Sequence, residues 1–121
     1  MAGKTILIVD DSPLITVRLQ VMLRELDNIG SVECAGDYTS ALQLFIATPP
    51  DIALLDINLP GRSGLDLLRH IKANYPSTIV IMLTNQSGYF YQNICKKLGA
   101  DYFIDKSKDF EDLPLIVSSH M

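Results

Sequence analysis

The sequence has no long hydrophobic run. Hydrophobic residues make up 48% of its 121 residues, but wholly apolar stretches such as residues 79–83 fall far short of the roughly 20 residues that span a membrane. Residues 1–4 lead directly into a strand-like run, without the apolar stretch of a signal peptide. These runs are too short to span a membrane, and we expect a cytoplasmic location.

The sequence is also poor in basic residues. Ten Lys and Arg stand against fourteen Asp and Glu, which gives a formal net charge of −4. Basic residues cluster only at Lys96 and Lys97 and at Lys106 and Lys108. Because nucleic acid binding needs a basic surface that displaces counterions, we expect no direct contact with DNA or RNA.

Cysteines are few and far apart. Cys34 and Cys95 lack the spacing of a zinc site or a redox pair. Each lies in an apolar segment, so we expect buried or half-buried thiols. The chain has no internal repeat or low-complexity stretch, and we expect one compact domain over residues 1–117. Residues 118–121 form a tail without structural signal, either the start of a linker or an addition to the natural chain.

Five short apolar runs alternate with helix-like segments along the chain. The runs cover residues 6–9, 31–35, 52–55, 79–83 and 102–104. Helical periodicity occurs over residues 13–27, 41–47, 64–75, 87–98 and 110–117. Apolar strands that alternate with helices predict an α/β fold, a doubly wound five-stranded parallel sheet with helices on both faces.

Local signals set the limits of two helices. Ser12 predicts the N-cap of the first helix and Pro13 its first residue. Ser63 and Asp66 resemble a capping pair for the third helix. The helical stripe of the first helix is expected to comprise Leu14, Val17, Val21 and Leu26, with Leu19, Met22 and Leu23 beside them.

Polar residues follow four of the predicted strands. Asp10 and Asp11 follow the first strand, Asp56 the third, Thr84 the fourth and Lys106 the fifth. Sheets of this kind place their sites beyond the carboxyl ends of the strands, so we expect these side chains to meet. Any one of them alone is more typical of a helix cap or a loop, but all five in this order favour a functional site.

Three carboxylates at one sheet edge need a compensating positive charge. Mg²⁺, or Mn²⁺, would supply it together with Lys106. This set suits phosphoryl transfer, in which positioning and charge neutralisation do most of the catalysis. Asp56 is the best candidate nucleophile, one that would become an aspartyl phosphate, because its strand is central in the expected order 2-1-3-4-5.

The chain resembles the receiver domain of bacterial two-component response regulators over nearly its whole length. The resemblance implies a flavodoxin-like fold, with Asp56 as the phosphoacceptor. It also implies that Asp10, Asp11 and Asp56 bind Mg²⁺ together with the backbone carbonyl of Asn58. The matching segments are residues 6–12, residues 56–66, Thr84 and residues 99–106.

The same resemblance implies a conformational switch. Thr84 and Lys106 would contact the phosphoryl oxygens, and Phe103 would be the aromatic switch residue. Three positions depart from the usual pattern, and the third, Asn85, lies at the rim of the expected phosphorylation pocket. Phe103 stands where tyrosine is common, and Ser107 follows Lys106 where the family usually has proline, so the usual cis peptide bond is not assumed.

The expected rim of the phosphorylation pocket is polar. Asn85 follows Thr84 where the family usually has a small residue, and its amide can reach toward the acidic centre. Gln86, with Asn58 across the pocket, would order or exclude the hydrolytic water.

The resemblance implies a signalling switch rather than an enzyme, one that catalyses only its own phosphorylation and dephosphorylation. The donor would be a histidine kinase or a histidine phosphotransfer protein. The output would be an effector domain or a homodimer, through the fourth helix, fifth strand and fifth helix. A haloacid dehalogenase-type phosphatase is one alternative, but residues 9–12 lack its Asp-x-Asp-x-Thr/Val motif. The other, a docking-only receiver, is disfavoured by the intact acidic set.

Overall fold

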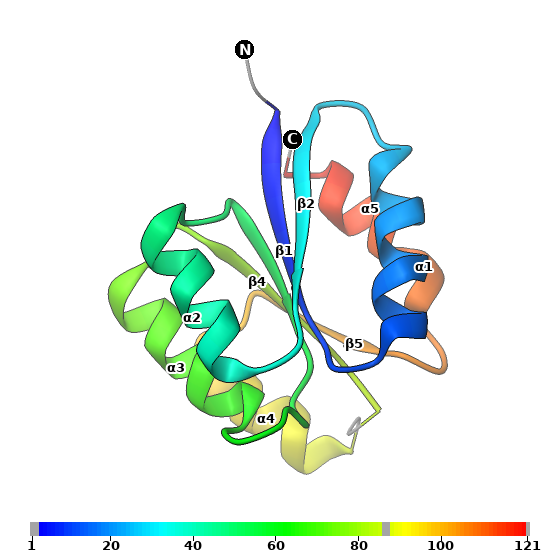
Figure 1. The fold of residues 1–121 in the computed structure, drawn as a ribbon. Helices are drawn as coiled ribbons and strands as arrows, with labels where there is room; N and C mark the ends of the chain where they lie inside the picture. Colours follow the sequence, from blue (N-terminus) through cyan, green and yellow to red (C-terminus); the bar gives the residue numbers. More distant parts are fainter. Residues whose placement is uncertain (1–2, 86–87, 121) are drawn as a thin grey trace.

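A computed structural model describes residues 3–85 and 88–120 of the chain. This part forms one parallel sheet between two layers of helices (Figure 1). In chain order its elements are β1 (Lys4–Val9), α1 (Pro13–Arg24), β2 (Ile29–Ala35), α2 (Tyr38–Ala47), β3 (Ile52–Leu55), α3 (Gly64–Asn74), β4 (Ile79–Thr84), α4 (Tyr89–Lys97), β5 (Tyr102–Asp105), a 3₁₀ turn (Phe110–Asp112) and α5 (Leu113–Ser118).

The strand order is β2-β1-β3-β4-β5, and every neighbouring pair is parallel. This confirms the predicted doubly wound sheet. Helices α1 and α5 cover one face, and α2, α3 and α4 cover the other (Figure 1). The order reverses between β1 and β3, so the carboxyl ends of these two strands flank the point where such sheets place their sites.

The sheet separates two hydrophobic cores. Because side chains alternate along a strand, Leu7 and Val9 of β1 join the core beneath α2, α3 and α4. Ile6 and Ile8 join the core beneath α1 and α5. The two cysteines lie in different cores. Cys95 is buried in the core beneath α2, α3 and α4, and Cys34 is half-buried against the core beneath α1 and α5, which agrees with the expected burial of both thiols. Burial raises the pKa of the Cys95 thiol to about 11, as for an inert core residue.

The N-caps of α1 and α3 are the two predicted serines, but one predicted hydrogen-bond partner differs. The Ser12 hydroxyl accepts a hydrogen bond from the Ile15 amide, and Pro13 is the first residue of α1, as predicted. The Ser63 hydroxyl caps α3 by accepting from the Leu65 amide at 3.0 Å. Ser63 is thus confirmed as the N-cap of α3, but its hydroxyl does not accept from the Asp66 amide as a capping box requires.

The apolar residues predicted to form the stripe of α1 divide between two sides of the helix. Leu14, Val17 and Val21 are 77%, 56% and 60% exposed, whereas Leu19 and Leu23 are fully buried. Helix α1 is therefore apolar on two sides, and residue spacing alone does not decide which side meets the sheet. Among the described residues, α1 thus carries an exposed stripe of three aliphatic side chains.

The remaining differences are small shifts of element limits. Helix α2 begins at Tyr38 rather than Ala41 because Asp37 caps it, accepting from the Ser40 amide at 2.7 Å. The last helical segment begins as a 3₁₀ turn and continues to Ser118, one residue into the predicted tail. No helix in residues 3–85 and 88–120 has the length and hydropathy needed to cross a bilayer.

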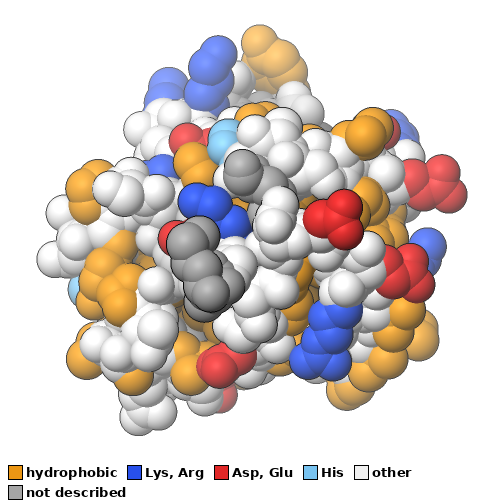
Figure 2. Space-filling model, turned by 90° about the horizontal axis from the view of Figure 1, so that it is seen from above, with side chains coloured by type: hydrophobic (Ala, Val, Ile, Leu, Met, Phe, Trp, Pro, Cys, Tyr) orange, Lys and Arg blue, Asp and Glu red, His pale blue; other side chains and the backbone are white. Residues whose placement is uncertain are grey.

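The end of the molecule where both termini lie is opposite the carboxyl ends of the strands (Figure 1). Acidic and basic side chains are interspersed with small apolar groups on this end face (Figure 2).

Candidate functional site

The carboxyl ends of β1 and β3 bring three acidic side chains together. Asp10 follows β1 and Asp56 follows β3, and both are buried, at 4% and 7% exposure. Asp11 is exposed. Carboxylate oxygens from these three residues all lie within 4.8 Å of one another. The predicted acidic cluster is therefore present in the structure.

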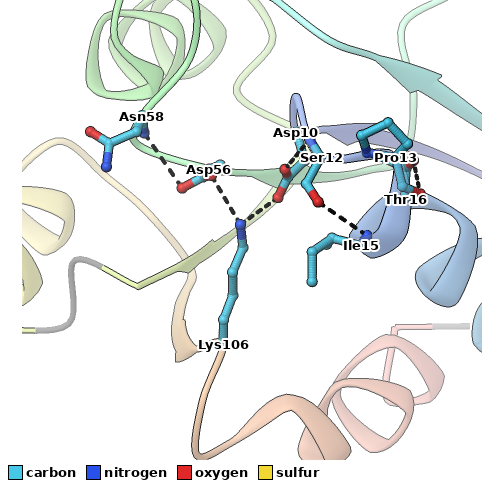
Figure 3. Close-up of polar contacts among 8 residues, drawn as sticks. All are labelled: Asp10, Ser12, Pro13, Ile15, Thr16, Asp56, Asn58 and Lys106. Atoms are coloured by element: carbon cyan, nitrogen blue, oxygen red, sulfur yellow. Dashed lines mark hydrogen bonds and ion pairs between the residues drawn. The ribbon is translucent and has the colours of Figure 1, made fainter.

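Lys106 joins the two buried carboxylates. Its ammonium lies 2.5 Å from Asp10 Oδ2 and 2.9 Å from Asp56 Oδ2, and its side chain points between them (Figure 3). Burial by itself would lower the pKa of Lys106. The hydrogen bonds and charges of Asp10 and Asp56 outweigh that effect, so the pKa of Lys106 is raised above its ordinary value.

Backbone amides hold the other oxygen of each buried carboxylate. Asp10 Oδ1 accepts a hydrogen bond from the Ser12 amide at 2.9 Å. Asp56 Oδ1 accepts a longer one from the Asn58 amide at 3.4 Å. The amide of Asp56 itself donates to the carbonyl of Val9, which ties β3 to β1 at the site. Both carboxylates are thus oriented with Oδ2 toward Lys106.

The acidic cluster has the properties of a divalent cation site. Asp10 Oδ2 is buried, and its partner among the described residues is the Lys106 ammonium. Hard cations such as Mg²⁺ and Ca²⁺ prefer carboxylate and carbonyl oxygens. Asp10, Asp11 and Asp56 therefore could hold a metal ion.

Thr84 and Phe103 lie on β4 and β5. Thr84 is fully buried at the end of β4, and its carbonyl accepts a hydrogen bond from the Lys106 amide at 3.1 Å. Phe103 pairs in register with Met82 and is partly buried against the core beneath α4. The predicted phosphoryl-contacting and switch residues thus lie on neighbouring strands.

The predicted rim residues are less closely engaged. Asn58 is exposed, and its side-chain amide points away from Asp56 (Figure 3). Asn85 is exposed just beyond β4. Gln86 lies outside the described residues. Of the two rim residues that the structure describes, Asn58 contacts Asp56 through its backbone amide.

Two residues at the site were not predicted from the sequence. Gly64 begins α3 and donates its amide to the Ile57 carbonyl at 2.7 Å. Asp105 is a buried carboxylate immediately before Lys106. The sequence does show a glycine at the start of the third helix and an acidic residue next to Lys106. Neither feature predicts which atoms Gly64 and Asp105 contact.

The sequence is similar to those of known proteins over nearly its whole length. The response regulator receiver domain model matches residues 6–118. The Fimbriae Z protein of Salmonella typhimurium is 32% identical over 113 residues, which is 93% of this chain and 54% of that protein. The chain thus spans about half the length of the curated relatives it matches.

Solved structures show the same likeness. A CheY-like response regulator receiver domain protein from Methanospirillum hungatei JF-1 superimposes with a TM-score of 0.88 at 28% identity, covering 98% of this chain and 93% of the other. The BeF3-activated DrrB receiver domain gives the same TM-score and identity, covering 99% and 97%.

Proposed function

The chain belongs to the family of response regulator receiver domains, and we propose that within it Asp56 accepts a phosphoryl group from a phosphohistidine. The donor would be a histidine kinase or a histidine phosphotransfer protein. A carboxylate oxygen of Asp56 attacks phosphorus, the new phosphorus–oxygen bond forms, and the phosphorus–nitrogen bond breaks with its electron pair left on the imidazole nitrogen. The observation that carries this proposal is the Lys106 ammonium, 2.9 Å from Asp56 Oδ2.

Each neighbouring side chain has a role in this step. Lys106 neutralises charge on the phosphoryl oxygens, and the Thr84 hydroxyl donates a hydrogen bond to one of them. Asp10, Asp11 and Asp56, with the Asn58 carbonyl, would hold Mg²⁺. When bound, this ion would neutralise further phosphoryl charge. The domain acts on its own carboxylate, so it is a switch rather than an enzyme that turns over a separate substrate.

The exposed stripe of α1 suits the docking of the phosphohistidine donor. Asp10, Asp11 and Ser12 lead directly into α1, so this stripe (Leu14, Val17 and Val21) begins beside the acidic cluster. A donor helix packed on it would bury apolar surface and hold its histidine near Asp56. A charged substitution on this stripe is therefore expected to slow transfer from the protein donor while leaving transfer from a small phosphodonor unchanged.

Phosphorylation would be read out at the face made by α4, β5 and α5. Two exposed aromatic side chains, Tyr89 and Phe90, begin α4. This face would contact an effector domain or a second copy of the chain. The reaction and its readout are those of a cytoplasmic two-component pathway.

The proposal is tested by phosphorylation with acetyl phosphate and Mg²⁺. Intact mass is expected to increase by one phosphoryl group in the natural chain and not in Asp56→Asn. Asp27→Asn, a substitution in the turn after α1, is the matched control and should accept the group normally. Modification that persists in Asp56→Asn would show that another residue is the acceptor.

A further inference from the structure

The backbone turn after β5 determines where Lys106 starts. The amide of Lys106 donates to the Thr84 carbonyl at 3.1 Å, which extends the pairing with β4 by one residue. The chain then turns, because the amides of Lys108 and Asp109 both donate to the Asp105 carbonyl, at 3.2 and 2.9 Å. The side chain of Lys106 leaves the backbone between these two constraints.

The carboxylate of Asp105 closes the same turn. Its Oδ1 accepts a hydrogen bond from the Ser107 amide at 2.7 Å and another from the Ser107 hydroxyl at 2.6 Å. Asp105 is only 7% exposed, so its end of these bonds is shielded from water, although Ser107 is exposed. Hydrogen bonds to an ionised acceptor are stronger than those between neutral groups.

We propose that Asp105 and Ser107 are positioning residues for Lys106, because together they fix the turn that directs its ammonium between Asp10 and Asp56. The consequence for phosphoryl transfer rests on the proposed function. A lysine side chain has many rotamers, and a fixed backbone origin limits those that reach both carboxylates. The Asp105–Ser107 contact thereby sets how well Lys106 is placed to neutralise the phosphoryl group.

Ser107 supplies two donors that the residue usual in this family lacks. Proline has neither a backbone N–H nor a hydroxyl, so both hydrogen bonds to Asp105 depend on serine at this position. Threonine would keep both donors, and alanine would keep only the amide. Comparing alanine with serine or threonine at position 107 therefore measures the contribution of the hydroxyl bond, and comparing proline with alanine measures that of the amide bond.

The first test compares Ser107→Ala with Ser107→Thr and the natural chain. Two quantities are measured: the rate of phosphorylation by acetyl phosphate with Mg²⁺, and the ¹³C relaxation order parameter of the Lys106 Cε methylene without phosphodonor. Loss of the hydroxyl bond is expected to slow phosphorylation about three- to tenfold and to lower the order parameter. Ser107→Thr should restore both. The matched control is Ser119→Ala, which removes a 2.6 Å hydroxyl bond to the Ile116 carbonyl far from the site and should change neither.

A second variant, Asp105→Asn, keeps the shape of the acceptor but removes its charge, and should act in the same direction as Ser107→Ala. If Ser107→Ala has the same Lys106 order parameter and the same phosphorylation rate as the natural chain, even with reduced stability, the proposal is overturned. If the natural chain is not phosphorylated at Asp56, the proposed function fails. The Lys106 order parameter would still decide whether the two residues position the lysine.

Discussion

Gly64 and Asp56 are in direct backbone contact. A Cβ atom on Gly64 would lie 1.8 Å from the Asp56 carbonyl oxygen and 2.8 Å from its carbonyl carbon. The first turn of α3 therefore packs against the backbone of the proposed phosphoacceptor. No side chain larger than hydrogen fits there unless one of these segments moves.

Gly64→Ala is expected to lower the free energy of unfolding by about 1–3 kcal/mol, because the added methyl meets backbone atoms that cannot rotate away. It should also slow phosphorylation, since the displaced atoms belong to Asp56. Urea unfolding and the rate with acetyl phosphate measure the two effects. Gly36→Ala is the control, because a Cβ there meets nothing within 4 Å. Equal stability of the two variants would show that α3 shifts freely.

Removal of the exposed carboxylate should separate metal binding from folding. Asp11→Ala is expected to lower the affinity for Mg²⁺, measured by calorimetric titration, and to abolish metal-dependent phosphorylation. The fold should be kept or even stabilised, because the substitution relieves repulsion among the three carboxylates. Unchanged affinity in Asp11→Ala would place the metal elsewhere.

Asn85 is expected to obstruct the pocket entrance. Asn85→Ala should accelerate phosphorylation by small donors and leave Mg²⁺ affinity nearly unchanged, because in the proposed function Thr84 and Lys106 would already contact the phosphoryl oxygens. Stopped-flow or mass-based kinetics at several donor concentrations would measure the rate. A slower variant would mean that the amide assists transfer.

Phe103 is expected to couple phosphorylation to the α4, β5 and α5 face. A shift from mostly inactive to mostly active needs about 5.5 kcal/mol of differential interaction, and charge-assisted contacts from Thr84 and Lys106 would supply roughly 1.5–3 kcal/mol each. Phe103→Ala should still be phosphorylated but should lose phosphorylation-dependent chemical-shift changes in α4. Retention of those changes would exclude an aromatic relay.

The ion pairs of Lys106 predict a dependence of stability on alkaline pH. Its folded-state pKa is raised above the ordinary 10.5, so its stabilising contribution is complete below pH 10.5 and is lost as pH rises through the raised pKa. The difference in unfolding free energy between the natural chain and Lys106→Met should therefore shrink at high pH. Lys108→Met, at an exposed position, should show no such trend. A constant difference for Lys106→Met would mean that charge is not what the lysine contributes.

The site residues that strand order brings together could be predicted from the sequence. Contacts that depend on how helices and turns pack could not. Apolar strands followed by Asp10, Asp56 and Lys106 were enough to predict that these residues meet, since parallel strands end at one edge. Which apolar side of α1 meets the sheet was not predicted, because two apolar sides satisfy the same periodicity. The Asp105–Ser107 turn could not be predicted, because position 107 was interpreted only as the loss of a proline.

The position of the chain ends has a practical consequence. Residue 4 begins β1 beside Ile29, and His120 lies 2.7 Å from the hydroxyl of Tyr102, the first residue of β5. Both described ends therefore lie at the pole opposite Asp56 (Figure 1). A fluorophore, an affinity handle or an immobilised surface joined at either end would leave the acidic pole open to solution. Conversely, a domain fused at either end would lie far from Asp56. It would respond to phosphorylation through a conformational change transmitted from one end of the sheet to the other.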